Sequence, residues 1–141
     1  MRNVFFDANV IIDWLVSSSI NHSVCTKAIN LSLNKSRHSY ISPTTIAITS
    51  YFLYKQFKSE KKVKTMAQQI YEPFRITTEN EETVKLAMSS KFTDIEDAIQ
   101  YHSALNQGID VIITQNTNDF SHSKIAILTP EEFCQMYELA R

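Results

Sequence analysis

Three aspartates stand where apolar stretches of this chain end or begin. Asp7 closes the apolar run that starts at Val4, Asp97 lies in the first turn of a helical pattern, and Asp119 follows the apolar residues 111–113 after a short polar loop. In open α/β sheets, ligands collect beyond the carboxyl ends of the strands. Carboxylates gathered there repel one another unless a hard cation such as Mg²⁺ neutralises them. This arrangement predicts a divalent cation and chemistry on phosphates.

The elements that would position these acids alternate along the chain. The apolar patterns predict strands at 3–6, 40–41, 74–76, 111–113 and 125–128, and helices at 9–16, 24–34, 43–57, 63–70, 78–88, 93–108 and from 130 onward. Such alternation predicts an α/β fold in three layers, in which a mostly parallel sheet of four to five strands carries helices on both faces.

Several helix starts carry capping signals. Ser42 precedes Pro43, and the pairs Thr78 with Glu81, Thr93 with Glu96, and Thr129 with Glu132 have the spacing of a capping box. Gly108 is the predicted stop of the helix that contains Asp97.

Composition limits the class of protein. With 141 residues and 43% hydrophobic content, the chain is long enough to fold as one domain, 1–141. Its formal net charge of −1 excludes a strongly basic surface of the kind that coats duplex nucleic acid. Cys25 and Cys134 are too few and too far apart for a disulfide framework, which indicates reduced thiols. No apolar run approaches the roughly 18 residues of a membrane span, so we expect a soluble, cytoplasmic protein with no membrane partner.

Other common sites for phosphate or metal are absent from the sequence. The chain has a single glycine, which excludes the glycine-rich loops of nucleotide binders. Its four histidines show no H-x-x-x-H spacing, so a zinc site is not expected. A phosphatase of the haloacid dehalogenase type would need a second acid two residues after Asp7, where Asn9 stands.

Four stretches in order resemble the PIN-domain nucleases, a family that includes the VapC-type toxins of toxin–antitoxin pairs. The stretches are 4–13, 41–47, 94–99 and 113–120, and the likeness covers nearly the whole chain. The resemblance implies Mg²⁺- or Mn²⁺-dependent hydrolysis of single-stranded RNA, leaving 5′-phosphate and 3′-hydroxyl ends. It also implies an antitoxin partner and a homodimer. The family's acidic centre corresponds to Asp7, Asp97 and Asp119, with support from Asn9, Thr114 and Asn116.

One position departs from the family pattern. The family usually carries a glutamate on the helix after the second strand, and the matching residue here is Ile48. Asp94 or Glu96 could supply the missing charge from the other helix, and Thr45 or Thr49 could contribute through a water molecule. Two functions therefore remain open: a ribonuclease, or a PIN-like module that binds RNA or protein without catalysis.

Several of these residues also have purely structural interpretations. Asp7 could cap the helix that follows it, Glu96 could belong to a capping box with Thr93, and Asp94 could interact with the helix dipole.

Two further groups bear on binding. Lys55, Lys58, Lys61 and Lys62 form a basic stretch that is either a solvated helix and turn or a guide for the RNA backbone. The aromatic residues Trp14, Tyr51, Phe52 and Tyr54 exceed what one small domain is expected to bury, which favours a two-fold dimer.

Overall fold

The computed structural model describes residues 2–139, so residues 1, 140 and 141 of the predicted domain lie outside the described residues. In chain order the elements are β1 (Asn3–Phe6), α1 (Ala8–Leu15), α2 (His22–Lys35), β2 (His38–Ile41), α3 (Pro43–Phe57), α4 (Glu60–Tyr71), β3 (Arg75–Ile76), α5 (Glu81–Met88), α6 (Ile95–Asn106), β4 (Val111–Ile113), the 3₁₀ helix η1 (Thr117–Phe120), β5 (Ala126–Leu128) and α7 (Pro130–Leu139). None of the helices within residues 2–139 has both the length and the apolar character needed to cross a bilayer.

The five strands form one sheet in the order β3-β2-β1-β4-β5, and every neighbouring pair is parallel. This confirms the predicted parallel α/β sheet. The chain builds outward from β1 through β2 to β3, then returns to the other side of β1 with β4 and β5. The order of the strands therefore reverses between β1 and β4, which is where open α/β sheets usually place their ligands.

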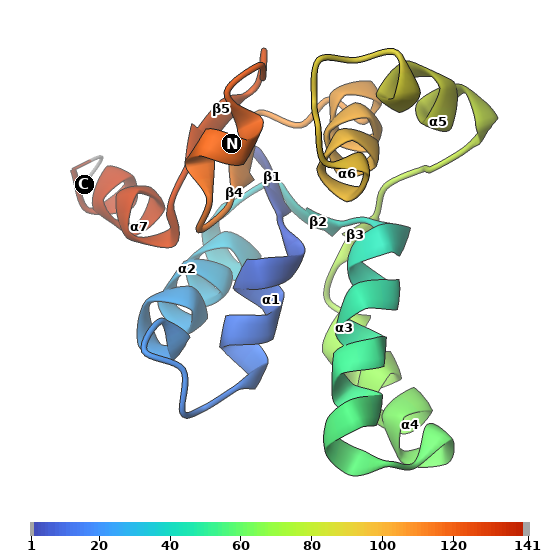
Figure 1. Ribbon diagram of the computed structural model, residues 1–141. Coiled ribbons are helices and arrows are strands. Elements are labelled where there is room, and N and C mark those ends of the chain that lie inside the picture. The colour runs from blue at the N-terminus through green and yellow to red at the C-terminus, as the bar shows by residue number, and fades with distance from the viewer. Residues whose placement is uncertain (1, 140–141) are drawn as a thin grey trace.

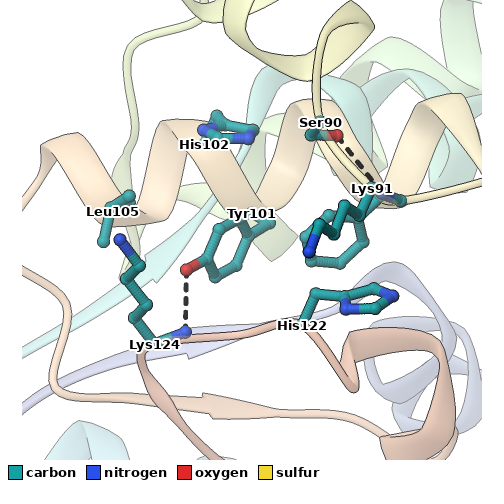
Figure 2. Close-up of a pocket in the computed structure, with 8 residues that line it drawn as sticks. Ser90, Lys91, Tyr101, His102, Leu105, His122 and Lys124 are labelled. Atoms are coloured by element: carbon teal, nitrogen blue, oxygen red, sulfur yellow. Dashed lines mark hydrogen bonds between the residues drawn. The ribbon is translucent and has the colours of Figure 1, made fainter.

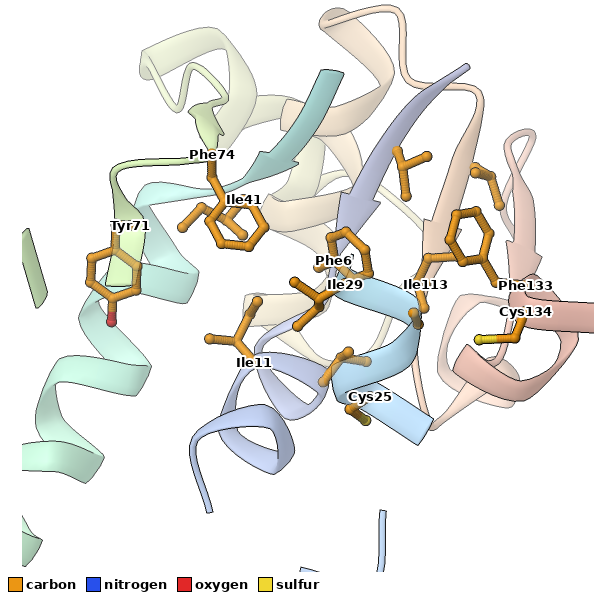
Figure 3. Packing of buried hydrophobic residues seen from close by; sticks show 14 residues of the cluster. Phe6, Ile11, Cys25, Ile29, Ile41, Tyr71, Phe74, Ile113, Phe133 and Cys134 are labelled. Carbon is orange, nitrogen blue, oxygen red and sulfur yellow. The ribbon is translucent and has the colours of Figure 1, made fainter. Parts of the chain in front are cut away.

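Alternating side chains of the central strands enter two separate cores. Val4 and Phe6 of β1 pack with α1, α2 and α7 on one face, where Ile11, Ile29 and Phe133 are fully buried (Figure 3). On the opposite face Phe5 packs with side chains of α6 and η1. Figure 1 shows these layers, with α1, α2 and α7 on one side of the sheet and α5 and α6 on the other. Because both faces are covered, β4 is apolar along its whole length and β1 is apolar from Val4 onward.

The second strand is longer than predicted, because its first two residues are polar and gave no apolar signal in the sequence. β2 begins at His38, which pairs with Asn3, and Ser39 is buried beside it. The Ser39 hydroxyl lies 2.6 Å from the Ser32 hydroxyl of α2, so its burial is compensated by a hydrogen bond.

Helix caps agree with the sequence at α3 and α7 and differ at α5 and α6. Ser42 accepts the Thr45 amide at 3.0 Å, and Thr129 with Glu132 forms the reciprocal pair of a capping box. Gly108 follows α6 with φ +71°, a conformation that glycine adopts without a steric cost.

The two predicted capping boxes at Thr78 and Thr93 are wrong. Asn80 caps α5 in a box with Thr83, and Asp94 caps α6 by accepting the Asp97 amide at 2.9 Å. Asparagine and aspartate compete well with threonine for the cap position, and each of these helices starts one or two residues later than the threonine signal indicates.

Replacing the true cap of α5 should therefore cost more than replacing the apparent one. Asn80→Ala should lower the free energy of unfolding by about 1 kcal/mol, since the amides at the start of α5 lose their partner. Thr78→Ala, at an exposed neighbouring position, should change it by less than about half that amount. Urea denaturation of the two variants measures the difference, and equal losses would contradict the cap assignment.

Candidate active site

Asp7 is held at the carboxyl end of β1 by contacts to both of its carboxylate oxygens. Oδ1 accepts the Ala8 amide at 2.7 Å, which caps α1, and Oδ2 accepts the Thr114 hydroxyl at 2.8 Å. The Asp7 amide continues the sheet by donating to the Ile113 carbonyl at 3.0 Å. Only 5% of the residue is exposed. Asp7 is therefore both the helix cap that the sequence allowed and an oriented carboxylate at the point where the strand order reverses.

The Thr114 hydroxyl joins the loop after β4 to this carboxylate. While it donates to Asp7, its oxygen accepts the Asn116 amide at 3.1 Å and the Asn9 side-chain amide at 3.5 Å. A hydroxyl has one donor and two acceptor positions, so all three are used. Asn9 also accepts the Gln115 amide at 3.3 Å. Asn9 and Thr114 thus hold the loop against Asp7, and Asn116 contributes through its backbone amide while the residue itself is exposed.

Asp97 enters the same region from the first turn of α6. Burial, together with the negative charges of Asp7, Asp94, Asp119 and Glu96 in decreasing order of effect, raises the pKa of the Asp97 carboxyl to about 7. Among residues 2–139 no lysine, arginine or histidine forms an ion pair with it. Asp97 therefore stands in an excess of negative charge.

Asp119 lies on the exposed side of η1. Its charge raises the pKa of both Asp7 and Asp97, although for Asp7 burial is the largest cause and Asp119 the smallest. Its amide donates to the Asn116 carbonyl at 3.0 Å, which fixes the start of η1 beside the Thr114 loop. The fold thus brings the three predicted aspartates within one electrostatic field. Asp94 and Glu96 are exposed at its edge, with Asp94 serving as the α6 cap.

The donor atoms of this region suit a hard cation, since carboxylates, hydroxyls and side-chain amides all present oxygen. Within the described part of the chain, however, no three His, Cys, Asp or Glu side chains are close enough together to hold a metal ion. A cation bound here would have to draw Asp97 and Asp119 toward Asp7, which is held rigidly by Ala8 and Thr114.

Sequence reasoning missed Gln100, which is 1% exposed on α6. Its Oε1 accepts the Thr45 hydroxyl at 2.8 Å, which leaves its NH₂ group free to donate, and a hydrogen bond from this side chain lowers the pKa of Asp7. The signal in the sequence was a polar residue on the otherwise buried face of the helix, three positions after Asp97.

On the side of the site where the family usually places its glutamate, α3 contributes only neutral groups, and the carboxylate of Glu79 accepts hydrogen bonds from Thr44 at the start of this helix. Ser42 donates to the Thr45 hydroxyl oxygen at 3.1 Å, and Thr45 in turn reaches Gln100. Ile48 follows Thr45 by three residues on α3 and is half-buried. Thr49 does not turn toward Gln100, because its hydroxyl donates to the Thr45 carbonyl at 2.7 Å and contacts the Tyr71 hydroxyl. An amide thus stands near Asp7 on this side, with no carboxylate from α3.

The basic stretch lies apart from these acids. Its four lysines are exposed around the turn between α3 and α4, which Figure 1 shows at the far end of that hairpin from the sheet. The ammonium groups of Lys55 and Lys62 lie 4.8 Å and 4.6 Å from the ring centroids of Tyr51 and Phe57. These two lysines therefore cover aromatic rings of their own hairpin.

Comparisons of the sequence and of the fold with known proteins agree on one family. A model of the PIN domain matches residues 3–118. Ribonuclease VapC1 of Aquifex aeolicus (strain VF5) is 30% identical over 141 residues, which cover 96% of each chain. A toxin–antitoxin complex from Klebsiella pneumoniae shares the fold with a TM-score of 0.67 at 20% identity, covering 90% of this chain and 97% of that one. VapC20 of Mycobacterium tuberculosis, a toxin that cleaves the sarcin-ricin loop, has a TM-score of 0.61 at 14% identity, covering 77% and 86%.

The charge crowding around Asp97 predicts an unusual effect of its removal. A pKa raised by folding means that the folded state favours the protonated carboxyl, so stability falls as the pH rises from about 4 through about 7. Asp97→Asn should flatten this decline and stabilise the metal-free protein at pH 8 by about 1 to 2 kcal/mol, an amount reduced by the partial exposure of the group. Urea denaturation across that pH range measures both effects. Glu72→Gln, at an exposed position on the end of α4, is the control, and an equal response of the two variants would contradict the prediction.

Proposed function

The chain belongs to the PIN-domain family, and on that premise we propose that it is a metal-dependent endoribonuclease acting on single-stranded RNA. The observation that carries this proposal is the placement of Asp7, Asp97 and Asp119 where the strand order reverses, close enough that the charges of Asp7 and Asp119 raise the pKa of Asp97 and the charge of Asp119 raises that of Asp7. The RNase name of the Aquifex relative and the RNA-cleaving VapC20 structure support the choice of RNA. A toxin that pairs with an antitoxin protein is the biological role we propose, supported by the Klebsiella complex.

The residues of this chain would divide the chemistry among them. Asp7 is the fixed ligand, since Ala8 and Thr114 bond to both of its oxygens and set the orientation of the carboxylate. Asp97 and Asp119, which are less buried, are the ligands that adjust. Gln100 favours the ionised form of Asp7 that a cation requires, because its hydrogen bond, with those of Thr114 and Ala8, opposes the rise in the pKa of that carboxyl caused by burial.

We propose Mg²⁺ or Mn²⁺ as the cation held by these three aspartates. When bound, such an ion makes a water molecule more acidic and offsets the charge that develops on the phosphate. Thr114, Asn9 and Asn116 hold the loop that leads to Asp119, so they set how far this acid can move toward the substrate. A cytoplasmic location is proposed with this function, since Cys25 and Cys134 are both free thiols buried in the core.

Cleavage of a labelled single-stranded RNA tests the proposal. The wild-type protein should cut it in Mn²⁺ and stop when EDTA is added, while Asp7→Asn should lower the rate at least about a hundredfold by removing a fixed ligand. Ile48→Glu should raise the rate several-fold, since it restores a carboxylate on the helix turn next to Thr45. Ile48→Gln, which is similar in size and uncharged, is the matched control.

The outcomes separate the two functions that the sequence leaves open. Cutting that persists in EDTA would contradict a metal-dependent mechanism. An inactive wild-type protein that remains inactive after Ile48→Glu would favour the non-catalytic binding module.

We also propose a homodimer, with its interface on the aromatic surface of the α3–α4 hairpin. Tyr51, Tyr54 and Phe57 are 63%, 42% and 41% exposed, which is unusual for large rings on one hairpin. Trp14, included in the predicted surplus, instead packs edge-on against Phe74 at 6.0 Å. Aromatic residues are enriched in the buried centres of interfaces.

Tyr51→Glu should therefore dissociate the dimer without unfolding the protein. Light scattering over a concentration series measures the mass, and a melting curve reports the fold. Phe52→Glu at the adjacent, half-buried position should instead destabilise the subunit by several kcal/mol, because a charge would enter partly buried surface. A wild-type mass that stays that of a monomer at tens of micromolar would overturn the dimer.

A further inference from the structure

A concave region with positively charged walls lies beside the acidic site. It is a pocket of about 320 Å³ between the loop that precedes α6, α6 itself, and the loop that leads from η1 to β5. This volume is at the lower end of the range for small-molecule sites. Its walls include two lysines, two histidines and two aromatic rings: Lys91, Lys124, His102, His122, Phe92 and Tyr101 (Figure 2). None of its lining residues is acidic.

Aromatic rings form one wall of this pocket. The Phe92 and Tyr101 rings lie 4.8 Å apart with an angle of 31° between their planes, and His122 meets Phe92 edge-on at 6.2 Å. The Tyr101 hydroxyl accepts the Lys124 amide at 2.8 Å, which ties the loop before β5 to α6. Phe92 is only half-buried even though it is in contact with other rings. A half-exposed ring supported by a second one can stack against a flat ligand.

Positive groups and hydrogen-bonding nitrogens surround this wall. Lys91, Lys124 and His122 are exposed, and Figure 2 shows the Lys91 and Lys124 side chains on either side of the Tyr101 ring. Both ring nitrogens of His102 are shielded from solvent, and within the described residues neither has a hydrogen-bond partner. Because both nitrogens are closed to solvent, the groups that a ligand can reach are the exposed side chains of Lys91, Lys124 and His122.

Two of the segments that line the pocket also carry the aspartates of the acidic site. Tyr101 follows Asp97 by four residues on α6, so the two side chains lie on the same face of the helix, about one turn apart. On the other side, Asp119 precedes Phe120, whose ring meets Phe92 at 6.0 Å, and His122 lies two residues after Phe120 in the loop that follows η1. A single-stranded RNA that lay across the acids would therefore reach this pocket next.

We propose that this pocket binds one nucleotide of the RNA, with its base against Phe92 and its phosphate between Lys91 and Lys124. The inference rests on the proposed ribonuclease function. It adds the place where the RNA nucleotide next to the cleaved bond is held. Stacking on an aromatic ring together with basic side chains along the backbone is the usual way in which proteins hold single-stranded nucleic acid. The exposed ring of His122 adds a hydrogen-bonding group for a base edge or a 2′-hydroxyl. An acidic peptide would use the lysines and leave the aromatic wall without a role, so RNA fits the whole set of residues better.

Binding of a fluorescently labelled RNA octamer of mixed sequence, measured by anisotropy in Asp97→Asn protein with EDTA, tests the pocket without cleavage. Added to this background, Lys91→Ala with Lys124→Ala should weaken binding about tenfold or more, and should reduce the slope of log Kd against log salt by about 0.7, the value for one lost phosphate contact. Phe92→Leu should weaken binding at least about fivefold, because a stacked base loses its ring.

The matched control removes two positive charges elsewhere. Lys27→Ala with Lys35→Ala, on α2 at the opposite face of the sheet from α6, should change the affinity less than about twofold. All four lysines are exposed, so neither double variant should unfold, and a melting curve on each verifies this.

The results distinguish this inference from the function on which it rests. If the Asp97→Asn protein binds RNA and the two double-lysine variants lose equal affinity, the pocket is overturned while the nuclease proposal stands. If Asp97→Asn protein binds no RNA and wild-type protein cuts none, both fail. Binding of a poly-glutamate peptide that depends on Lys91 and Lys124, with RNA binding unaffected by their loss, would assign the pocket to a protein partner instead.

Discussion

The parallel pairing of β1 with β4 is the constraint on which the rest of the site depends. Phe6 lies opposite Ile113, so the next residue of each strand, Asp7 and Thr114, leaves the sheet at the same level. The hydrogen bond between their side chains follows directly from that register. A shift of one residue would turn Phe6 away from its core and separate the hydroxyl from the carboxylate.

The same pairing explains why a buried acid is tolerated at this position. Burial raises the pKa of Asp7, and three donors, from Thr114, Ala8 and Gln100, oppose that effect. Each donor comes from a different element, namely the end of β4, the start of α1 and the middle of α6. The carboxylate is therefore compensated only when the sheet and both helices are assembled around it, which couples the site to the whole fold.

Charge is distributed unevenly around this centre. The acids of α6 and η1 repel one another, while lysines and histidines gather on the loop before α6, on α6 itself and on the loop after η1. A molecule with a formal net charge of −1 thus places a negative and a positive region side by side. A polyanion requires a cation at the first region and is attracted directly by the second.

Much of the architecture could be predicted from the sequence because it rests on local patterns. The apolar runs at 3–6 and 111–113 and the alternation with helices predicted the parallel sheet, and the order of the four motif stretches predicted the family. Asp7, Asp97 and Asp119 were recognisable because each follows or opens a regular element, and parallel strands direct their ends to one edge.

Other features depend on contacts between distant residues and were decided only by the tertiary structure. The threonine signals at 78 and 93 failed because Asn80 and Asp94 offer competing caps, and the local sequence does not rank them. The role of Gln100 could not be recognised from the sequence, because its hydrogen-bond partner Thr45 lies 55 positions away along the chain. The pocket of Lys91, Tyr101 and Lys124 joins three segments in the same way. Periodicity reports which face of an element is buried, whereas the partner that meets that face is determined by how the layers pack.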